Sequence, residues 1–233
     1  QARHAAKRFL PDAVPEDIIN DVLAMTIRTP TSFNAQPWAC IIVRDEEQKE
    51  ALAQAMVGPN IMKVRAAPLT AVFLADLQPT RRVPRMMEEE RRAGTPEERV
   101  ARLPAMIGLF GGEGAAAEAL RRGVTAALSP LKPMPSVTST EAWSYKHAGL
   151  AAQTYLLAAT AHGLATAPME GFDGRRVCAA LDVPDRYGVA VAVATGYEDP
   201  QHAPSAASWR FAPEEMVFLD RFGAPVPDVP TSL

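Results

Sequence analysis

The sequence predicts an α+β fold, and three observations support this prediction. Two stretches carry apolar residues at helical spacing, and the longer of them runs from Thr138 to His162. Four shorter apolar runs have the length of buried strands. Apolar residues make up 48% of the 233 positions, which is enough to bury the core of one large domain.

The first half of the chain begins with a well-marked helix. Pro15 suits the start of a helix, and the acidic Glu16 and Asp17 lie at the positive end of its dipole. Apolar residues then recur at helical spacing until the pattern stops at Arg28-Thr29-Pro30. The other elements predicted for this half are a strand at Trp38 to Val43, a helix from Asp45 to about Met56, and a strand at Leu69 to Leu74.

A long apolar helix opens the last part of the chain. Thr138 and Glu141 have the spacing of a capping box, so we expect the helix to begin there and to end at Gly163. Its middle is apolar almost all round, which is typical of a central buried helix. The elements predicted after it are a strand at Leu164 to Met169, a helix at Gly174 to Leu181 capped by Asp173, and a strand at Tyr187 to Thr195 covered on both faces.

The stretch from Gln78 to Pro135 differs from the rest of the chain. It is rich first in Arg and Glu and then in glycine and proline, and its charges are typical of a solvated surface. Too few apolar residues recur in it for a separate domain. We therefore expect a partly helical insertion at 78–135 within a single domain that spans residues 1–233.

One glycine pattern in the insertion resembles a dinucleotide-binding loop. Gly112-Glu113-Gly114 followed by Ala117 fits G-x-G-x-x-A, in which backbone N–H groups approach a pyrophosphate. However, no acidic residue follows about 20 residues later, and the proline-rich Ser129 to Pro135 replaces the next strand. A turn between two helices is the better interpretation.

Composition limits the remaining classes of function. A formal net charge of −3 gives no support for nucleic-acid binding, and no run approaches the length of about 18 apolar residues that a membrane span needs. Cys40 and Cys178 form no CxxC pair and are expected to be buried, inert thiols in a reducing compartment. We expect a cytoplasmic protein, although the start at Gln1 leaves open an organelle-targeting segment.

Two polar segments near the N-terminus are candidates for binding an anion or a cofactor. Residues 3–8 contain four basic or potentially basic side chains, which form either a local anion-binding field or a solvated basic end. Pro30 to Trp38 is dense in hydroxyl and amide groups held between prolines. A turn leading into a strand would explain these prolines, but it does not explain the amides of Asn34 and Gln36.

Taken together, these residues resemble the nitroreductase family of FMN enzymes. The family's opening motif, Arg-x-Ser-x-Arg/Lys-x-Phe, is matched by Arg3, Ala5, Lys7 and Phe9. Its Pro-Ser-Ser-x-Asn-x-Gln-Pro-Trp loop is matched by Pro30 to Trp38. The further matches, in chain order, are Asn60 with Lys63, Pro168 to Asp173, and Gly196-Tyr197 with Arg210 ahead of Pro213-Glu214-Glu215.

The resemblance implies an FMN site that needs no metal and no catalytic side-chain acid or base. The residues it places around the phosphate and the adjoining ring edge are Arg3, His4, Ala5, Lys7 and Arg210. At the ring it places Asn60 and Lys63 on the pyrimidine side, with Pro168, Met169, Glu170 and Gly171 near N5. From the partner subunit it places Pro30, Thr31, Ser32 and Asn34. Ala5 and Ser208 depart from the family pattern of Ser and of Lys or Arg, which weakens the expected grip on the phosphate.

The resemblance also implies a nitroreductase-like fold, with a mostly antiparallel central sheet flanked by helices in a domain-entwined homodimer. The implied reaction is ping-pong. NADH or NADPH passes a hydride to the flavin and leaves, and a nitroaromatic, quinone or related oxidant takes its place. Two alternatives stay open, a reductive dehalogenase of the same family and a flavin-binding or sensory protein without turnover. The insertion has glutamates at 88–90 but no tyrosine, which disfavours the dehalogenase, whose lid carries Glu, Tyr and Lys.

Two segments carry further expectations. The insertion at 78–135 is expected to be a lid over the substrate face of the flavin, with a surface excursion packed away from the flavin as the alternative. The apolar run from Met216 to Leu219 is expected to be a strand that pairs with the other subunit, because its own chain offers no obvious partner.

Overall fold

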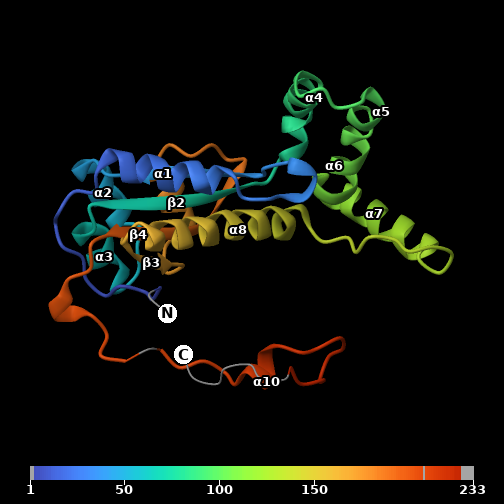
Figure 1. Cartoon of the computed structure of the whole chain (residues 1–233). Coiled ribbons are helices and arrows are strands. Elements are labelled where there is room, and N and C mark those ends of the chain that lie inside the picture. Colours follow the sequence, from blue (N-terminus) through green and yellow to red (C-terminus); the bar gives the residue numbers. More distant parts are fainter. Residues whose placement is uncertain (1–2, 207, 227–233) are drawn as a thin grey trace.

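The computed structural model describes residues 3–206 and 208–226. Its centre is a four-stranded sheet with the order β1-β2-β4-β3 (Figure 1). The strands span Trp38–Val43 (β1), Leu69–Asp76 (β2), Ala165–Met169 (β3) and Tyr187–Gly196 (β4). All three pairings are antiparallel, so both the α+β fold and the antiparallel sheet are confirmed.

Helices cover both faces of this sheet (Figure 1). They span Glu16–Ile27 (α1), Glu46–Ala53 (α2), Asn60–Ala66 (α3), Thr140–Ala161 (α8) and Gly174–Ala180 (α9). Because successive residues of a strand point to opposite faces, β2 serves two cores. Ala71 and Phe73 pack in one core with α1 and α8, whereas Val72 and Leu74 pack in the other with α2, α3 and α9.

Helix α8 begins one residue later than the capping-box spacing predicts. Ser139 is the N-cap, and its hydroxyl oxygen accepts a hydrogen bond from the Ala142 amide, so the prediction that Thr138 caps the helix is wrong. The register is set by the buried Thr140, whose hydroxyl donates to the Gly112 carbonyl at 2.6 Å. Two other predicted boundaries are confirmed, the end of α8 at Gly163 and the N-cap of α9 at Asp173.

The insertion is largely helical, which confirms the prediction of a partly helical segment. Its elements are η2 (Pro79–Arg82), α4 (Val83–Arg92), α5 (Glu97–Val100), α6 (Leu103–Gly111) and α7 (Ala115–Leu128). Val83 and Ile107 form a small core with Ala35 and Trp143 of the main body. Figure 1 shows the insertion at one end of the sheet, with α7 pointing away from the body.

The glycine pattern in the insertion forms a turn between helices, as interpreted from the sequence. Gly112-Glu113-Gly114 joins α6 to α7, and Gly114 has a φ of +92°, which favours glycine. Residues 106–110, which a dinucleotide loop would require as a strand, are helical. The pyrophosphate loop therefore has no structural support here.

A buried carboxylate ties the insertion to the sheet. The side chain of Asp76, at the end of β2, has no exposed surface. Its Oδ2 lies 2.7 Å from Nε of Arg82 and 3.4 Å from Nη2 of Arg186. Arg82 also donates to the Trp38 carbonyl at 3.2 Å. The first turn of the insertion is thus held against two strands by one arginine.

The C-terminal tail leaves the body after β4 and contains η3 (Pro200–His202) and α10 (Pro213–Met216). Figure 1 shows this tail lying apart from the sheet and its helices. The predicted strand at Met216 to Leu219 is wrong for the single chain, because Pro213 and two glutamates start a helix that ends at Met216. Beyond the helix, Phe218 forms an isolated antiparallel bridge with Pro225 and packs on the ring of Phe222.

Candidate functional site

The basic N-terminal segment runs beside β3. Ala5 forms a parallel bridge with Thr166, and the Ala6 amide donates to the Thr166 carbonyl at 2.9 Å. The ring of His4 contacts the carboxylate of Glu198 at 2.8 Å, so a protein carboxylate already engages this expected phosphate ligand. Arg3 is the first described residue and lies four positions before Lys7.

Helix α3 supplies the second part of the site. Lys63 donates from Nζ to Oδ1 of Asn60 at 3.1 Å, and Nδ2 of Asn60 donates to the Gly171 carbonyl at 3.3 Å. Burial and the positive charge of Lys7 both lower the pKa of Lys63. In the described part of the chain, no carboxylate forms an ion pair with Lys7 or Lys63. Two lysines that repel each other without a protein counter-charge favour an anionic ligand.

The segment after β3 is shaped by its contact with α3. A Cβ atom on Gly171 would lie 2.8 Å from Nδ2 of Asn60, so any larger residue here would require the Asn60 amide to move. The Gly171 carbonyl also accepts the Val57 amide at 2.9 Å, while Met169 is buried in the core. Among the described residues, the amides of Glu170 and Gly171 donate no hydrogen bond within the chain. Two backbone donors therefore remain available beside the lysines.

The loop from Pro30 to Asn34 is held in a strained conformation. Phe33 and Asn34, and then Gln36, have φ values of 56°, 52° and 45°, a region that costs non-glycine residues roughly 1–3 kcal/mol each. The Gln36 amide donates to Oγ1 of Thr31 at 3.0 Å, which closes the loop internally. A second hydrogen bond joins the loop to the body of the protein, because the Ser32 amide donates to Nε2 of His147 on α8 at 3.1 Å.

Lys7, Asn60, Lys63 and Gly171 together are called the lysine group. The loop from Pro30 to Asn34 lies apart from this group in the single chain. The loop leads into β1, at one edge of the sheet, and is bound to α8 on one face. Gly171 follows β3, at the opposite edge, and Lys63 lies on α3, against the other face. Three interstrand spacings separate these edges, about 14 Å. The structure therefore brings together Lys7, Asn60, Lys63 and Gly171 but not the loop of the same chain.

Arg210 also lies outside the lysine group. It is exposed in the tail, and among the described residues its guanidinium donates only to the carbonyls of its neighbours Ser208 and Trp209. The large side chains around it, Trp209 and Phe211, are exposed as well. The expected role of Arg210 at a phosphate stays a prediction that requires the tail to contact another surface.

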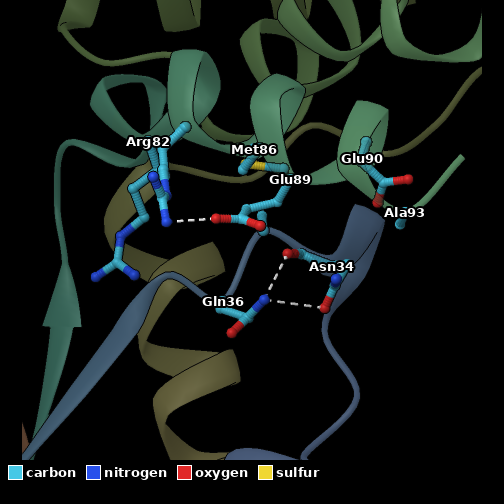
Figure 2. A pocket seen from close by; sticks show the side chains of 9 residues that line it. Asn34, Gln36, Arg82, Met86, Glu89, Glu90 and Ala93 are labelled. Atoms are coloured by element: carbon cyan, nitrogen blue, oxygen red, sulfur yellow. Dashed lines mark hydrogen bonds and ion pairs between the residues drawn. The ribbon is translucent and has the colours of Figure 1, made fainter. Parts of the chain in front are cut away.

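A pocket of about 510 Å³ lies between the strained loop and α4. Figure 2 shows Asn34 and Gln36 on one side of it, opposite Met86, Glu89 and Glu90. Of the four described charged side chains in its wall, three are in ion pairs. Arg85 pairs with Glu89, Arg82 pairs with Asp76, and Glu90 accepts a hydrogen bond from the Thr95 hydroxyl at 2.6 Å.

Both cysteines are free, and neither belongs to the lysine group. Burial raises the pKa of the Cys40 thiol to about 12 and, together with Asp185, raises that of Cys178. Thiols with raised pKa are poor nucleophiles at neutral pH, which agrees with the expectation that both are inert. None of the described helices is both long enough and apolar enough to cross a membrane.

Known proteins resemble this chain in both sequence and fold. The model of the nitroreductase family matches residues 1–197, which is most of the chain. The chain belongs to the nitroreductase family. An NADH dehydrogenase of Thermus thermophilus is 30% identical over 203 residues, which cover 87% of this chain and 86% of that protein.

Solved structures of the family share the fold. A Bacillus subtilis protein provisionally named a nitroreductase has a TM-score of 0.72 at 21% identity, with 93% of this chain and 94% of that chain covered. A similarly named protein of Exiguobacterium sibiricum, solved in complex with FMN, has a TM-score of 0.70 at 19% identity, with 90% and 94% covered. The nitroreductase family is one of flavin-using oxidoreductases, so this chain is assigned to that broad class.

Sequence reasoning missed His147 and the walls of the pocket at α4. His147 lies within an apolar helical run, where a histidine carries no local signal, and its partner Ser32 is 115 positions away. The charges of Arg82 and Glu89 were read as part of a solvated run, although Arg82 reaches the fully buried Asp76. The tertiary fold brings these residues into contact, so the local spacing of residues in the sequence does not predict such contacts.

Proposed function

We propose that the protein is an FMN-dependent NAD(P)H oxidoreductase that acts by a ping-pong mechanism as a homodimer. The observation that carries the proposal is the group formed by Lys7, Lys63, Asn60 and the free amides after β3. It offers two cations without carboxylate partners beside amide donors, and this donor set fits an anionic, hydrogen-bonding cofactor. The name of the Thermus thermophilus relative and the FMN complex of the Exiguobacterium sibiricum protein support the same choice.

The residues of this group would divide the binding of FMN between them. Lys7, with Arg3 before it, would hold the phosphate, while Lys63 and Asn60 would bind the pyrimidine side of the ring. A cation there stabilises negative charge on a reduced flavin, and the amides of Glu170 and Gly171 would donate to the ring edge. The chemistry that such a cofactor supplies is acceptance of a hydride from NADH or NADPH and its return to an oxidant.

The homodimer is supported by surfaces that a monomer leaves exposed. On α8, Leu150 and Leu157 lie seven residues apart, which places them on the same side of the helix, and both are about half exposed. The tail exposes further large apolar side chains, namely Trp209, Phe211, Met216, Val217, Leu219 and Phe222. Apolar groups in such number favour burial against another chain. A second copy would also bring its strained loop to the lysine group, which the loop of the same chain does not meet.

The pocket at α4 would receive the electron acceptor. It borders Asn34 of the strained loop, so in the proposed dimer it opens beside the flavin held by the partner. The insertion would thus act as a lid over the substrate face. Because, among the described residues, both arginines of its wall are in ion pairs and the Glu90 carboxylate is not, the pocket suits neutral acceptors such as quinones or nitroaromatics better than anionic ones.

The experiment that tests the proposed function is a cofactor assay joined to a turnover assay. We expect the purified protein to be yellow and to release FMN and not FAD on denaturation. We also expect it to oxidise NADH or NADPH with menadione or a nitroarene as acceptor. Bound FMN without turnover would favour the flavin-binding or sensory alternative, and turnover of a halogenated tyrosine instead would favour the dehalogenase. A colourless protein that fails to bind added FMN would refute the proposal.

A further inference from the structure

We propose that His147 is a positioning residue for the cofactor. In its neutral form it holds the loop from Pro30 to Asn34 in the conformation that meets the flavin of a second subunit. The inference rests on the proposed function, which places this loop at the dimer interface. In this geometry His147 connects the loop to helix α8 of its own subunit by a hydrogen bond.

The hydrogen bonds of His147 define its tautomer. Its side chain is 1% exposed, and Nδ1 lies 2.7 Å from the Trp143 carbonyl. A carbonyl only accepts hydrogen bonds, so Nδ1 carries the proton. Nε2 is then an acceptor, and both the amide and the hydroxyl of Ser32 lie 3.1 Å from it and can donate to it. The neutral ring with its proton on Nδ1 is the protonation state that satisfies both neighbours.

The loop needs such an anchor because its conformation is strained. Phe33, Asn34 and Gln36 all lie in the left-handed region, which persists only where surrounding contacts enforce it. The hydrogen bond from the Gln36 amide to Thr31 is internal, while Ala35 and Phe33 attach this segment by apolar packing to the core that it shares with the insertion. The bond from Ser32 to His147 joins the loop to the longest helix of the fold.

Protonation of Nε2 would break the bond from the Ser32 amide, because two N–H groups would then face each other, and would leave the Ser32 hydroxyl oxygen as the partner of the ring. Burial lowers the pKa of His147, as does the neighbouring Lys146, while the bond to the Trp143 carbonyl opposes the shift. The loop residues 29–37 and α6 carry no titratable side chain. The charged groups on the other elements around His147 are the exposed Arg28 at the end of α1, the paired Arg85 and Glu89 on α4, and Asp76 of β2 in its pair with Arg82.

The sign of the pH effect follows from this lowered pKa. The unfolded histidine, with a pKa of about 6.5, takes up a proton before the folded one does. The stability that the neutral ring contributes therefore declines as the pH falls below about 6.5, and the bond itself is lost only as the pH falls through the lower pKa of the folded protein. FMN affinity of the wild type should decline over the same range.

A pair of neutral substitutions tests the proposal. In H147Q the side-chain carbonyl can replace Nε2 as acceptor for the Ser32 amide, whereas the shorter side chain of H147N cannot reach it. We expect H147N to weaken FMN binding about tenfold at pH 7.5 and to speed amide hydrogen exchange across residues 31–36. H147Q should stay close to wild type at pH 7.5 and, unlike wild type, should lose no further affinity between pH 6.5 and pH 5.

A matched control is H162N, the same substitution at the other end of α8, which should leave FMN binding and loop exchange unchanged. Exchange of β2 amides reports whether each variant is folded. Equal FMN affinity and equal loop exchange in H147N and wild type would overturn the proposal for His147 alone. A wild-type protein that binds no FMN would overturn the proposed function and this inference together, so the two failures are distinguishable.

Discussion

At the scale of single residues, the site depends on charges that the chain leaves without counter-charges. Burial and then the positive charge of Lys7 lower the pKa of Lys63, so the two ammonium groups repel each other in the folded protein. Such an arrangement opposes folding, and residues with perturbed pKa values are found preferentially at functional sites. An anion bound between the two lysines would turn this repulsion into attraction. The lysine pair is thus better explained by a ligand than by stability.

Gly171 provides a residue-scale test of the site with a matched control. In G171A the new Cβ would lie 2.8 Å from Nδ2 of Asn60, which must move and lose its bond to the Gly171 carbonyl. Loss of one hydrogen bond of about 1 kcal/mol predicts FMN affinity about fivefold lower, measured by fluorescence titration. In G174A the Cβ meets nothing within 4 Å, so affinity should not change. Equal affinities in the two variants would remove Asn60 from the binding site.

At the scale of helices and strands, the sequence predicts some parts of the fold and not others. All four strands were predictable from apolar runs in the sequence. The clearest are β2 and β4, which are buried on both faces of the sheet. Helix α3 was missed because its seven residues follow Pro59, which offers no side-chain cap, whereas α9, equally short, follows the N-cap Asp173. The lysine group could be predicted only from the family resemblance. The hydrogen bond between the strained loop and His147 could not be predicted at all, because no local sequence pattern links this helix to the loop.

The attachment of the insertion to the sheet gives a prediction about stability. In R82M the buried carboxylate of Asp76 loses its nearest partner, and breaking a buried pair costs about 3–5 kcal/mol. We expect the lower end of this range, because Arg186 stays 3.4 Å from the carboxylate. Urea unfolding monitored by tryptophan fluorescence measures the change. The exposed R81M is the control, and similar stability in the two variants would contradict the role of Asp76.

The proposed lid gives a second prediction at this scale. M86W fills part of the pocket of about 510 Å³ and should lower kcat/KM more for a bulky nitroaromatic than for a small quinone. We expect a difference of about tenfold between the two acceptors, with FMN content unchanged. E88W changes an exposed residue of the same helix that does not line the pocket, so its ranking of acceptors should match wild type. An unaltered ranking in M86W would place the pocket outside the active site.

At the scale of the whole molecule, the single chain holds two incomplete halves of one site. The lysine group lies on one face of the sheet, near its β3 edge, and the strained loop lies at the β1 edge, bound to the helix on the other face. A twofold arrangement of two copies can bring the loop of each chain to the lysine group of the other. The exposed apolar side chains of α8 and of the tail are the surfaces that such a dimer would cover.

The measurement that tests this account most directly is subunit complementation. N34A should disable the loop and K63M the lysine group, so each homodimer should show little NAD(P)H-dependent turnover. The heterodimer, co-expressed with two different tags and purified by both, would combine one doubly altered site with one intact site. The account predicts about half of the wild-type turnover. A heterodimer no more active than its two parents would contradict a site shared between chains.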